Sequence, residues 1–408
     1  MRWTAPHLAA RDIALAALLA AGVADPAAAQ SPSSDKNERG EDGNTPGQHG
    51  PTAVQVLVPS DDNLQFLNLW IAIGADYFAD EGLTVQIITP EARPLALQWM
   101  RQGKADVAVL PPPMYLALIG EARAGGRDIR VVANLLRSDP INLIVTRATW
   151  DRLGADADGP LERRLRALRG LRIGIALHPG PRLSALFATH GLRADEVLDI
   201  VPIKGQEQNA ALAEGRVAGL YAHSPYLERA LVHQDAVVVV DQSSGAVPAL
   251  ADLNIHSLVV SADILRRQPA MVRALVRAIA RAQQLAHSDV AAATRAVGAD
   301  LPDKPPAEIA RITALYAPAL PHTPRPSLDA MVRTMPLFPI MGAAPPAKAA
   351  ALAPYVAENL ADGLPAQTDS ADPAKSDGYP AWATIVATVG AALTVLALGL
   401  LWLRRRAR

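Results

Sequence analysis

The sequence predicts an α/β fold of two lobes, each built on a mainly parallel sheet. Short runs rich in Val, Ile and Leu alternate along residues 53–360 with stretches whose apolar residues recur at helical spacing. Such alternation is typical of parallel sheets, because neighbouring parallel strands need a crossover between them, usually a helix. The alternating region is long for one domain, which favours two lobes, and a weak internal repeat points the same way.

The repeat joins two segments that each contain the end of a helix, a strand and the start of the next helix. Residues 97–113 resemble residues 209–225, with Gly103 and Gly215 at the helix ends and a proline after each strand. Glycine is favoured just past a helix end, and proline in the first turn of the next helix. A duplicated lobe explains the repeat, although chance similarity between helix–strand–helix segments is the alternative.

The expected elements can be placed from the apolar pattern and the turn residues between its segments. Strands are predicted at 54–58, 85–89, 106–110, 130–136, 141–146, 171–176, 199–203, 217–222, 236–240 and 256–260. Helices are predicted at 64–80, 92–102, 113–123, 160–167, 182–190, 206–214, 224–231, 263–288 and 305–316.

The N-terminus predicts export. Residues 1–29 have the order of a secretory signal peptide, with arginines, an apolar run too short for a typical membrane span, and small residues at the cleavage site. An uncleaved anchor or a buried helix is the alternative. Residues 30–52 are rich in Ser, Pro, Gly and charged residues, and are predicted to be a disordered leader. Residues 361–380 repeat that composition and are expected to be a linker.

The C-terminus predicts a transmembrane helix. Residues 381–403 carry no charge, and a helix of this length spans ~34 Å, enough to cross the hydrocarbon core. Trp382 and Trp402 lie near its two ends, and the arginine-rich tail 404–408 is expected in the cytoplasm. The body of the protein is therefore expected on the periplasmic (extracytoplasmic) face of the inner membrane. A buried core helix is the alternative.

Charge, cysteine content and motifs argue against several functions. The net charge is −1, and about −5 without the four arginines of the tail (−1 − 4), so no basic face for nucleic acid is visible. The absence of cysteine excludes disulfides, thiolate catalysis and iron–sulfur clusters. The nine histidines lack a metal-binding spacing, and no phosphate loop or nucleophile elbow is present. We therefore expect no cofactor, no metal and no catalytic residue.

The first strand–helix–strand unit, around residues 63–83, carries the strongest resemblance to a known family. Its segment GADYFADEGLTV ends at Val85, and later segments continue the similarity in order and spacing as far as about residue 300. Those later segments are GKADVAVLP from Gly103, LRGLRIGI from Leu168, LAEGRV from Leu212 and LVVSADILRRQP from Leu258. Together they resemble the ABC-transporter substrate-binding proteins of the nitrate, taurine and sulfonate, and thiamine-precursor branch.

The resemblance implies a two-lobed periplasmic-binding-protein fold of type II, in which the chain crosses to the second lobe and returns. Lobe I is then expected at 53–139 and 246–360, and lobe II at 140–245. The implied partners are a small-molecule ligand and the permease subunits of an ABC transporter. Two features depart from the family: Ala218-Gly219 stand where an Asp is usual, which puts a turn or a ligand contact of lobe II in doubt, and most relatives lack a C-terminal span.

Candidate ligand contacts of lobe I lie in loops that follow predicted strands, because ligands bind beyond the carboxyl ends of strands in such sheets. Asn63 follows the first strand and either contacts the ligand or caps the first helix. Pro112 and Met114 follow the third strand. Ser138 and Asp139 lie at the expected first crossover, where Asp139 either contacts the ligand or is a turn residue.

The turn from His178 to Arg182 is the sharpest candidate of lobe II. Gly180 permits close approach of backbone to a ligand, and the free N–H groups of a helix start favour an anion. Arg182 can add a bidentate contact to a carboxylate or sulfonate. An ordinary strand-to-helix turn with Arg182 in solvent is the alternative.

The second candidate loop of lobe II surrounds His223 and Ser224. These two residues either contact the ligand or cap the next helix, while Tyr221 and Tyr226 flank the loop and suit stacking on a planar heteroaromatic ligand. Other aromatic residues lie at helical spacing and are expected in the core: Trp70, Tyr77 and Phe78.

The function that agrees with these observations is a membrane-tethered solute-binding protein. It is expected to capture a sulfonate- or nitrate-like anion, or a pyrimidine-like heteroaromatic, and deliver it to a permease. A ligand-sensing ectodomain with a separate signalling partner is the alternative. An enzyme that makes the thiamine pyrimidine fits poorly, because such relatives resemble one another through a cysteine-rich motif and this chain has no cysteine.

Overall fold

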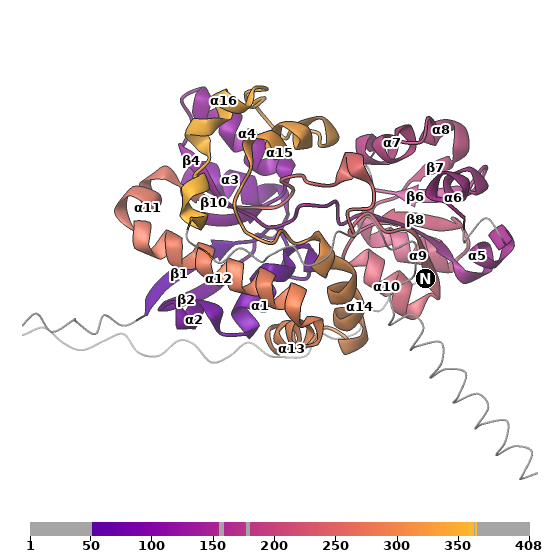
Figure 1. Ribbon diagram of the computed structural model, residues 1–408, viewed down its shortest axis with the longest axis horizontal. Coiled ribbons are helices and arrows are strands. Elements are labelled where there is room, and N and C mark those ends of the chain that lie inside the picture. The colour runs from indigo at the N-terminus through magenta and orange to yellow at the C-terminus, as the bar shows by residue number, and fades with distance from the viewer. Residues whose placement is uncertain (1–50, 155–158, 177–179, 363, 365–408) are drawn as a thin grey trace, which may run out of the picture. The chain divides into compact units, whose positions relative to one another are not determined.

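The computed structural model describes residues 51–154, 159–176, 180–362 and 364. These residues form two five-stranded mixed sheets with helices packed against them (Figure 1). The predicted α/β class is confirmed, but the prediction of mainly parallel sheets was wrong, because each sheet has two parallel and two antiparallel strand pairings. The expected signal peptide, the leader, the transmembrane helix at 381–403 and the basic tail lie outside the described residues, apart from the last two residues of the leader.

Sheet A has the strand order β2-β1-β3-β10-β4. Its first strand along the chain, β1, is parallel to β2 and β3, whereas β10 is antiparallel to both of its neighbours. The bounds are β1 (Thr52–Leu57), β2 (Leu83–Ile88), β3 (Val107–Leu110), β4 (Ile129–Asn134) and β10 (Ser257–Ser261).

Sheet B has the order β7-β6-β8-β5-β9, which is the same pattern. Here β6 is parallel to β7 and β8, and β5 is the strand antiparallel to both neighbours. The bounds are β5 (Asn142–Thr146), β6 (Arg172–Ile175), β7 (Asp199–Pro202), β8 (Gly219–Ala222) and β9 (Ala236–Val240). The two segments of the sequence repeat contain β3 and β8, which occupy equivalent places in the two sheets.

The helices cover the sheets and fill the connections between strands. Those near predicted positions are α3 (Pro94–Gln102), α4 (Pro112–Arg123), α6 (Leu161–Ala167), α7 (Gly180–Ala188), α9 (Gln208–Ala213), α10 (Tyr226–His233) and α14 (Pro306–Tyr316). Those not predicted are α5 (Arg147–Leu153), α8 (Ala194–Val197), α13 (Val290–Asp300), α15 (Leu328–Thr334) and α16 (Ala349–Leu352). Short 3₁₀ turns are η1 (Leu64–Phe66), η3 (Gly205–Glu207), η4 (Pro248–Leu250), η5 (Ala317–Ala319), η6 (Met335–Leu337), η7 (Ala353–Tyr355) and η8 (Glu358–Ala361).

Two helices predicted as continuous are broken, so those predictions were wrong. The range 64–80 divides into η1, α1 (Leu67–Gly74) and α2 (Tyr77–Asp80), because Asp76 has a left-handed backbone with φ of 58°. The range 263–288 divides into α11 (Ala262–Arg267) and α12 (Pro269–Ser288), because Pro269 begins a new helix and disfavours helical backbone in the residue before it.

The apolar faces of these elements form the core, whose burial supplies the main driving force for folding. Trp70 and Phe78 are buried as predicted, with 2% and 4% of their surface exposed. Tyr77 is only half-buried, and the Arg281 guanidinium lies over its ring at 4.1 Å from the centroid. Tyr77 is therefore at the edge of the core rather than inside it.

The C-terminal strap, which we define as residues 320–362, runs along the side of sheet A and is coloured orange to yellow in Figure 1. Val356 pairs with Val131 of β4 in a parallel bridge, and Ala357 N donates to Val131 O at 2.9 Å. The strap therefore covers the outer edge of sheet A.

Within the described part of the chain, no helix is long and apolar enough to cross a membrane.

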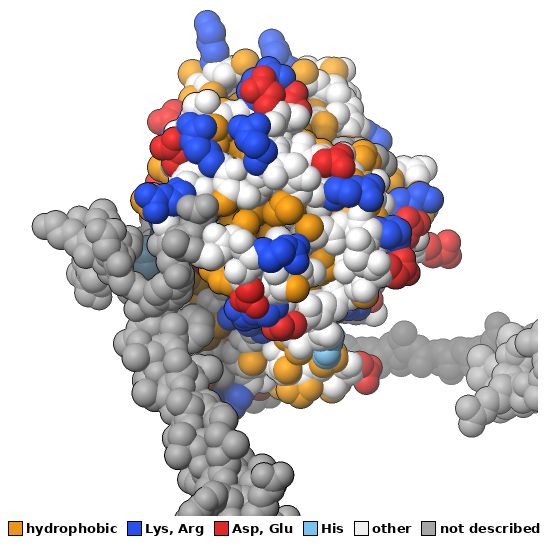
Figure 2. All heavy atoms as spheres, turned by 90° about the vertical axis from the view of Figure 1, so that its right-hand side faces the viewer, with side chains coloured by type: hydrophobic (Ala, Val, Ile, Leu, Met, Phe, Trp, Pro, Cys, Tyr) orange, Lys and Arg blue, Asp and Glu red, His pale blue; other side chains and the backbone are white. Residues whose placement is uncertain are grey.

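The face on the side of sheet B carries charges of both signs. Figure 2 shows Lys and Arg side chains interspersed with Asp and Glu around patches of apolar surface. A nucleic-acid-binding face would gather Lys and Arg into one patch or stripe.

Candidate ligand-binding pocket

A pocket of about 140 Å³ lies where the carboxyl ends of the strands of both sheets meet. We call it the central pocket. On the side of sheet A it is lined by residues that follow β1 and β3 and by residues just before the antiparallel β10. On the side of sheet B it is lined by the residue after β8 and by one residue of α7. Its lining residues are Pro59, Ser60, Asn63, Gln65, Phe66, Arg93, Pro111, Pro113, Met114, Arg182, His223, Ile255, His256 and Phe338.

Arg182 is the buried cation of this pocket. It lies in α7, is 8% exposed, and its Nη1 lies 3.4 Å from Oδ1 of the fully buried Asp139. Burial raises the pKa of Asp139, and the neighbouring guanidinium opposes that shift. Among the described residues, Arg182 Nε has no hydrogen-bond partner although it is buried. A buried N–H without an acceptor is costly, so this donor is suited to a ligand.

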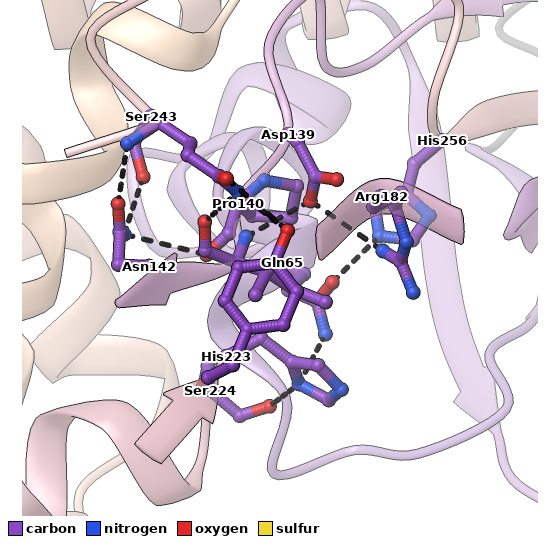
Figure 3. A network of polar contacts seen from close by, with 12 residues as sticks. Gln65, Asp139, Pro140, Asn142, Arg182, His223, Ser224, Ser243 and His256 are labelled. Atoms are coloured by element: carbon purple, nitrogen blue, oxygen red, sulfur yellow. Dashed lines mark hydrogen bonds and ion pairs between the residues drawn. The ribbon is translucent and has the colours of Figure 1, made fainter. Parts of the chain in front are cut away.

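Two histidines meet at the side chain of Gln65, as Figure 3 shows. Gln65 Nε2 lies 2.8 Å from His223 Nδ1, and Gln65 Oε1 lies 3.2 Å from His256 Nε2. Burial lowers the pKa of His223 to about 4 and that of His256 to about 3. Both rings are therefore neutral at neutral pH, and His256 Nδ1 has no partner in the described part of the chain.

A second polar contact holds the two sides of the molecule together beside the pocket. Ser224 Oγ accepts a hydrogen bond from Leu64 N at 2.9 Å and donates to Glu228 Oε1 at 2.7 Å. Lys304 Nζ lies 3.3 Å from the same carboxylate oxygen and donates to Asp62 O at 3.1 Å. Glu228 is fully buried, which raises its pKa, and Lys304 opposes that shift. We call Lys304, Glu228 and Ser224 the latch.

The structure brings together four of the residues expected from the sequence. The predicted residues that line the central pocket are Asn63, Met114, Arg182 and His223. Asn63 has the expected capping role, since it accepts a hydrogen bond from Gln65 N at 2.9 Å at the start of η1, and it also lines the pocket. The alternative that placed Arg182 in solvent was wrong, because α7 directs this side chain towards Asp139.

Other predicted residues do not line the pocket. Tyr221 is fully buried and its hydroxyl pairs with Gln242 Oε1 at 3.1 Å, so it has no free face for stacking. Ser224 belongs to the latch and Asp139 acts through Arg182. The remaining ones outside the lining are Pro112, Ser138, Gly180 and Tyr226, and His178 lies outside the described residues.

Several lining residues were missed, and most gave no sequence signal. Gln65 lies within the apolar spacing of the first helix, and His256 falls inside a predicted strand. Phe338 lies beyond the last predicted helix.

The departure from the family pattern at Ala218-Gly219 has a steric reason at its second residue: a Cβ on Gly219 would lie 2.2 Å from Ile144 O of the neighbouring strand.

A larger pocket of about 450 Å³ lies beside the latch and is lined in part by Lys304. We call it the acidic pocket, since five of its ten lining residues are acidic. They are Asp61, Asp62, Asp300, Asp303 and Glu308. Among the described residues, no cluster of histidines and carboxylates is arranged to hold a metal ion.

Comparison with known proteins defines the family of this chain. The family model described as NMT1-like matches residues 62–301, more than half of the chain, so the protein belongs to the NMT1-like family. No curated protein matches the sequence significantly.

Solved structures show the same fold at low sequence identity. A protein from Bordetella bronchiseptica RB50 matches with a TM-score of 0.53 and 21% identity, over 76% of this chain and 96% of that one. The alkanesulfonate-binding protein SsuA from Xanthomonas axonopodis pv. citri, bound to MOPS, matches with a TM-score of 0.51 and 16% identity, over 75% and 98%. The periplasmic aliphatic sulphonate-binding protein SsuA from Escherichia coli gives 0.51 and 13%, over 70% and 91%. The resemblance expected from the sequence is thereby confirmed.

Proposed function

We propose that this protein is a solute-binding protein that captures a compact anion or a small planar heteroaromatic molecule between two lobes. Lobe I comprises 53–139 and 246–360, and lobe II comprises 140–245. Membership of the NMT1-like family and the fold shared with sulfonate-binding proteins support this class. The central pocket is its ligand site.

The observation that carries the proposal is the incomplete hydrogen bonding of the Arg182 side chain in the central pocket. One edge of the guanidinium is engaged by Asp139, while Nε is buried and, within the described chain, has no acceptor. An oxyanion placed against Nε satisfies that donor with a charge-assisted hydrogen bond. Arg93 also lines the pocket, and none of the lining residues that the structure describes is a carboxylate. The pocket therefore favours negative charge.

His256 offers a hydrogen-bond acceptor that suits the second ligand class, the planar heteroaromatic molecules. When Nε2 donates to Gln65 Oε1, the neutral ring presents Nδ1 as an acceptor. A ring that carries both an acceptor and an N–H donor, such as an aminopyrimidine, can use Arg182 and His256 together. Both histidines contact an amide rather than a hydroxyl nucleophile, which favours binding over catalysis.

Two connecting segments form a hinge suited to closure around a ligand. The chain leaves sheet A after β4 and returns after β9, and the two segments lie side by side. Asn142 Nδ2 donates to Ser243 Oγ at 2.7 Å (Figure 3), and Asp139 N donates to Leu250 O at 3.0 Å. Paired segments of this kind let two lobes rotate as rigid bodies.

The finer parts of the function follow from the sequence. We propose that residues 1–29 direct export, that 381–403 anchor the protein in the inner membrane, and that the closed form delivers its ligand to permease subunits. The periplasmic face is then the place of capture.

A thermal-shift screen of the 408-residue chain tests the proposal. The panel contains nitrate, methanesulfonate, taurine and two aminopyrimidines, with sodium chloride as the ionic-strength control. We expect at least one compound to raise the melting temperature in a saturable manner, and Arg182→Met to need a roughly 10- to 100-fold higher concentration for the same shift. A panel without any saturable shift contradicts a compact anion or heteroaromatic as ligand.

A further inference from the structure

The C-terminal strap is fastened at two points beside the central pocket, both on the side of sheet A. Thr334 Oγ1 accepts a hydrogen bond from Asn254 N at 3.0 Å, and Asn254 precedes the lining residues Ile255 and His256. Met341 N donates to Pro113 O at 3.1 Å, and Pro113 lines the pocket. The strap is therefore held on either side of residue 338.

Close packing against α4 fixes the strap further. A Cβ on Gly120 would lie 2.2 Å from Ala343 O, so the strap backbone rests directly on the helix. The region matched by the family model ends at residue 301, before the strap begins.

Phe338 lies between the two fastening points and reaches across to lobe II. Its side chain is 6% exposed and lines the pocket, and Arg182 Cζ lies 4.3 Å from the centroid of its ring. Contact of a guanidinium with an aromatic face is attractive. The ring covers one face of Arg182 and Asp139 engages Nη1, so the Nε edge, which has no partner among the described residues, is the edge that suits a ligand.

We propose that Phe338 is a specificity-determining residue that limits ligand size and holds Arg182 edge-on to a compact anion. The inference rests on the proposed function of the central pocket. The pocket volume of about 140 Å³ is below the roughly 300–1,000 Å³ of sites for drug-sized ligands. Phe338 is part of the pocket lining, so truncating its side chain would open space for an anion with an apolar tail.

Calorimetric titration of the 408-residue chain with methane-, butane- and octanesulfonate tests the inference. The wild type is expected to bind methanesulfonate best. Phe338→Ala is expected to weaken methanesulfonate binding roughly three- to tenfold, as the contact with Arg182 is lost. The same variant is expected to bind the longer sulfonates more tightly, by up to about fourfold per buried methylene.

Two further variants separate the ring from the fold. Phe338→Leu keeps an apolar side chain, so it is expected to weaken methanesulfonate binding with a smaller gain for octanesulfonate. Leu337→Ala removes a buried neighbour on the same strap that does not line the pocket, so it is expected to keep the wild-type ranking. The inference is overturned if Phe338→Ala and Phe338→Leu keep that ranking, or if Leu337→Ala changes it equally. A wild type that binds neither sulfonates nor heteroaromatics overturns the proposed function as well.

Discussion

The two sheets have one strand order but give the pocket different chemistry. In each, the segments beyond the second and third strands of the order line the central pocket: after β1 and β3 in sheet A, and after β6 and β8 in sheet B. Sheet B supplies His223 and the buried Arg182, whereas sheet A supplies the amides of Asn63 and Gln65, the ring of His256 and the exposed Arg93. The difference teaches that two sheets of one topology can contribute unequally to one pocket, because the buried arginine of the lining lies on the side of sheet B.

The strap adds to this asymmetry. It covers the edge of sheet A at β4 and places Phe338 in the pocket. The side of sheet A thus contributes an aromatic ring that borders the pocket, and the side of sheet B contributes the buried cation.

Removing the charge that sheet B supplies should give the largest effect. Arg182→Met leaves Asp139 buried without its cation, so the free energy of unfolding should fall by ~3–5 kcal/mol. Ligand affinity should fall roughly 10- to 100-fold, as expected for one charge-assisted hydrogen bond. Urea unfolding and calorimetric titration measure the two effects.

A double variant and a surface variant complete that experiment. Asp139→Asn with Arg182→Met should recover part of the stability but not the binding. Arg172→Met, whose exposed partner is Asp199, should change stability by less than ~1 kcal/mol. Wild-type affinity in Arg182→Met contradicts the division of roles between the sheets.

Breaking the latch should affect both lobes without changing ligand preference. Lys304→Met removes the cation from the buried Glu228, with an expected loss of about 3 kcal/mol in unfolding free energy. Because Lys304 does not line the central pocket, affinities for all ligands should change by a common factor. Lys104→Met, an exposed site, is the control. A changed ranking of ligands with unchanged stability would show that the latch belongs to the binding site.

The strap can be tested through one glycine. Gly120→Ala forces a methyl group against Ala343 O and should lower stability by ~1–3 kcal/mol, as overpacking does. Gly298→Ala in α13 meets no atom within 4 Å and should raise stability by ~0.5–1 kcal/mol. Chemical denaturation compares the pair. Equal effects at both positions are incompatible with close packing of the strap.

The smallest effect should appear in the pH dependence. In the unfolded chain His256 takes up a proton near the ordinary histidine pKa of 6.5, whereas in the folded protein burial lowers its pKa to about 3 and the ring stays neutral. Stability should therefore fall as the pH drops below 6.5, by on the order of 1–2 kcal/mol at pH 5, with no contribution above 6.5.

The variant His256→Gln should remove this loss. Its melting temperature should decline less than that of the wild type between pH 6.5 and 4. Asp241, whose pKa burial raises to about 6, acts with the opposite sign in both proteins and cancels in the comparison. Identical pH profiles contradict a buried neutral His256.

Local sequence signals were enough to locate the strands but not to predict how the strands pair in the sheets. Each strand is an apolar run between turn residues, and each was placed within a few residues of its observed bounds. The insertion of β5 and β10 as antiparallel strands depends on contacts between distant segments, which periodicity does not encode. The left-handed backbone at Asp76 likewise breaks a continuous helical pattern.

The pocket divides in the same manner. Asn63, Met114 and His223 follow strands directly, and Arg182 lies at a helix start, so topology alone placed them at the site. Gln65 and His256 contact each other although they lie 191 positions apart in the sequence, so local patterns do not indicate the contact. Phe338 lies in the strap, whose sequence has no periodic pattern. Tyr221 was expected to stack on a ligand because of its place beside a loop, but the strand β8 includes it and buries it.

Hydrogen exchange with and without a saturating ligand tests the central claim that both lobes hold one ligand. The account predicts slower exchange in two separate segments, 60–66 of lobe I and 222–228 of lobe II, at the same ligand concentration. Protection confined to one lobe, or protection only around the acidic pocket at 300–305, would contradict capture between the lobes.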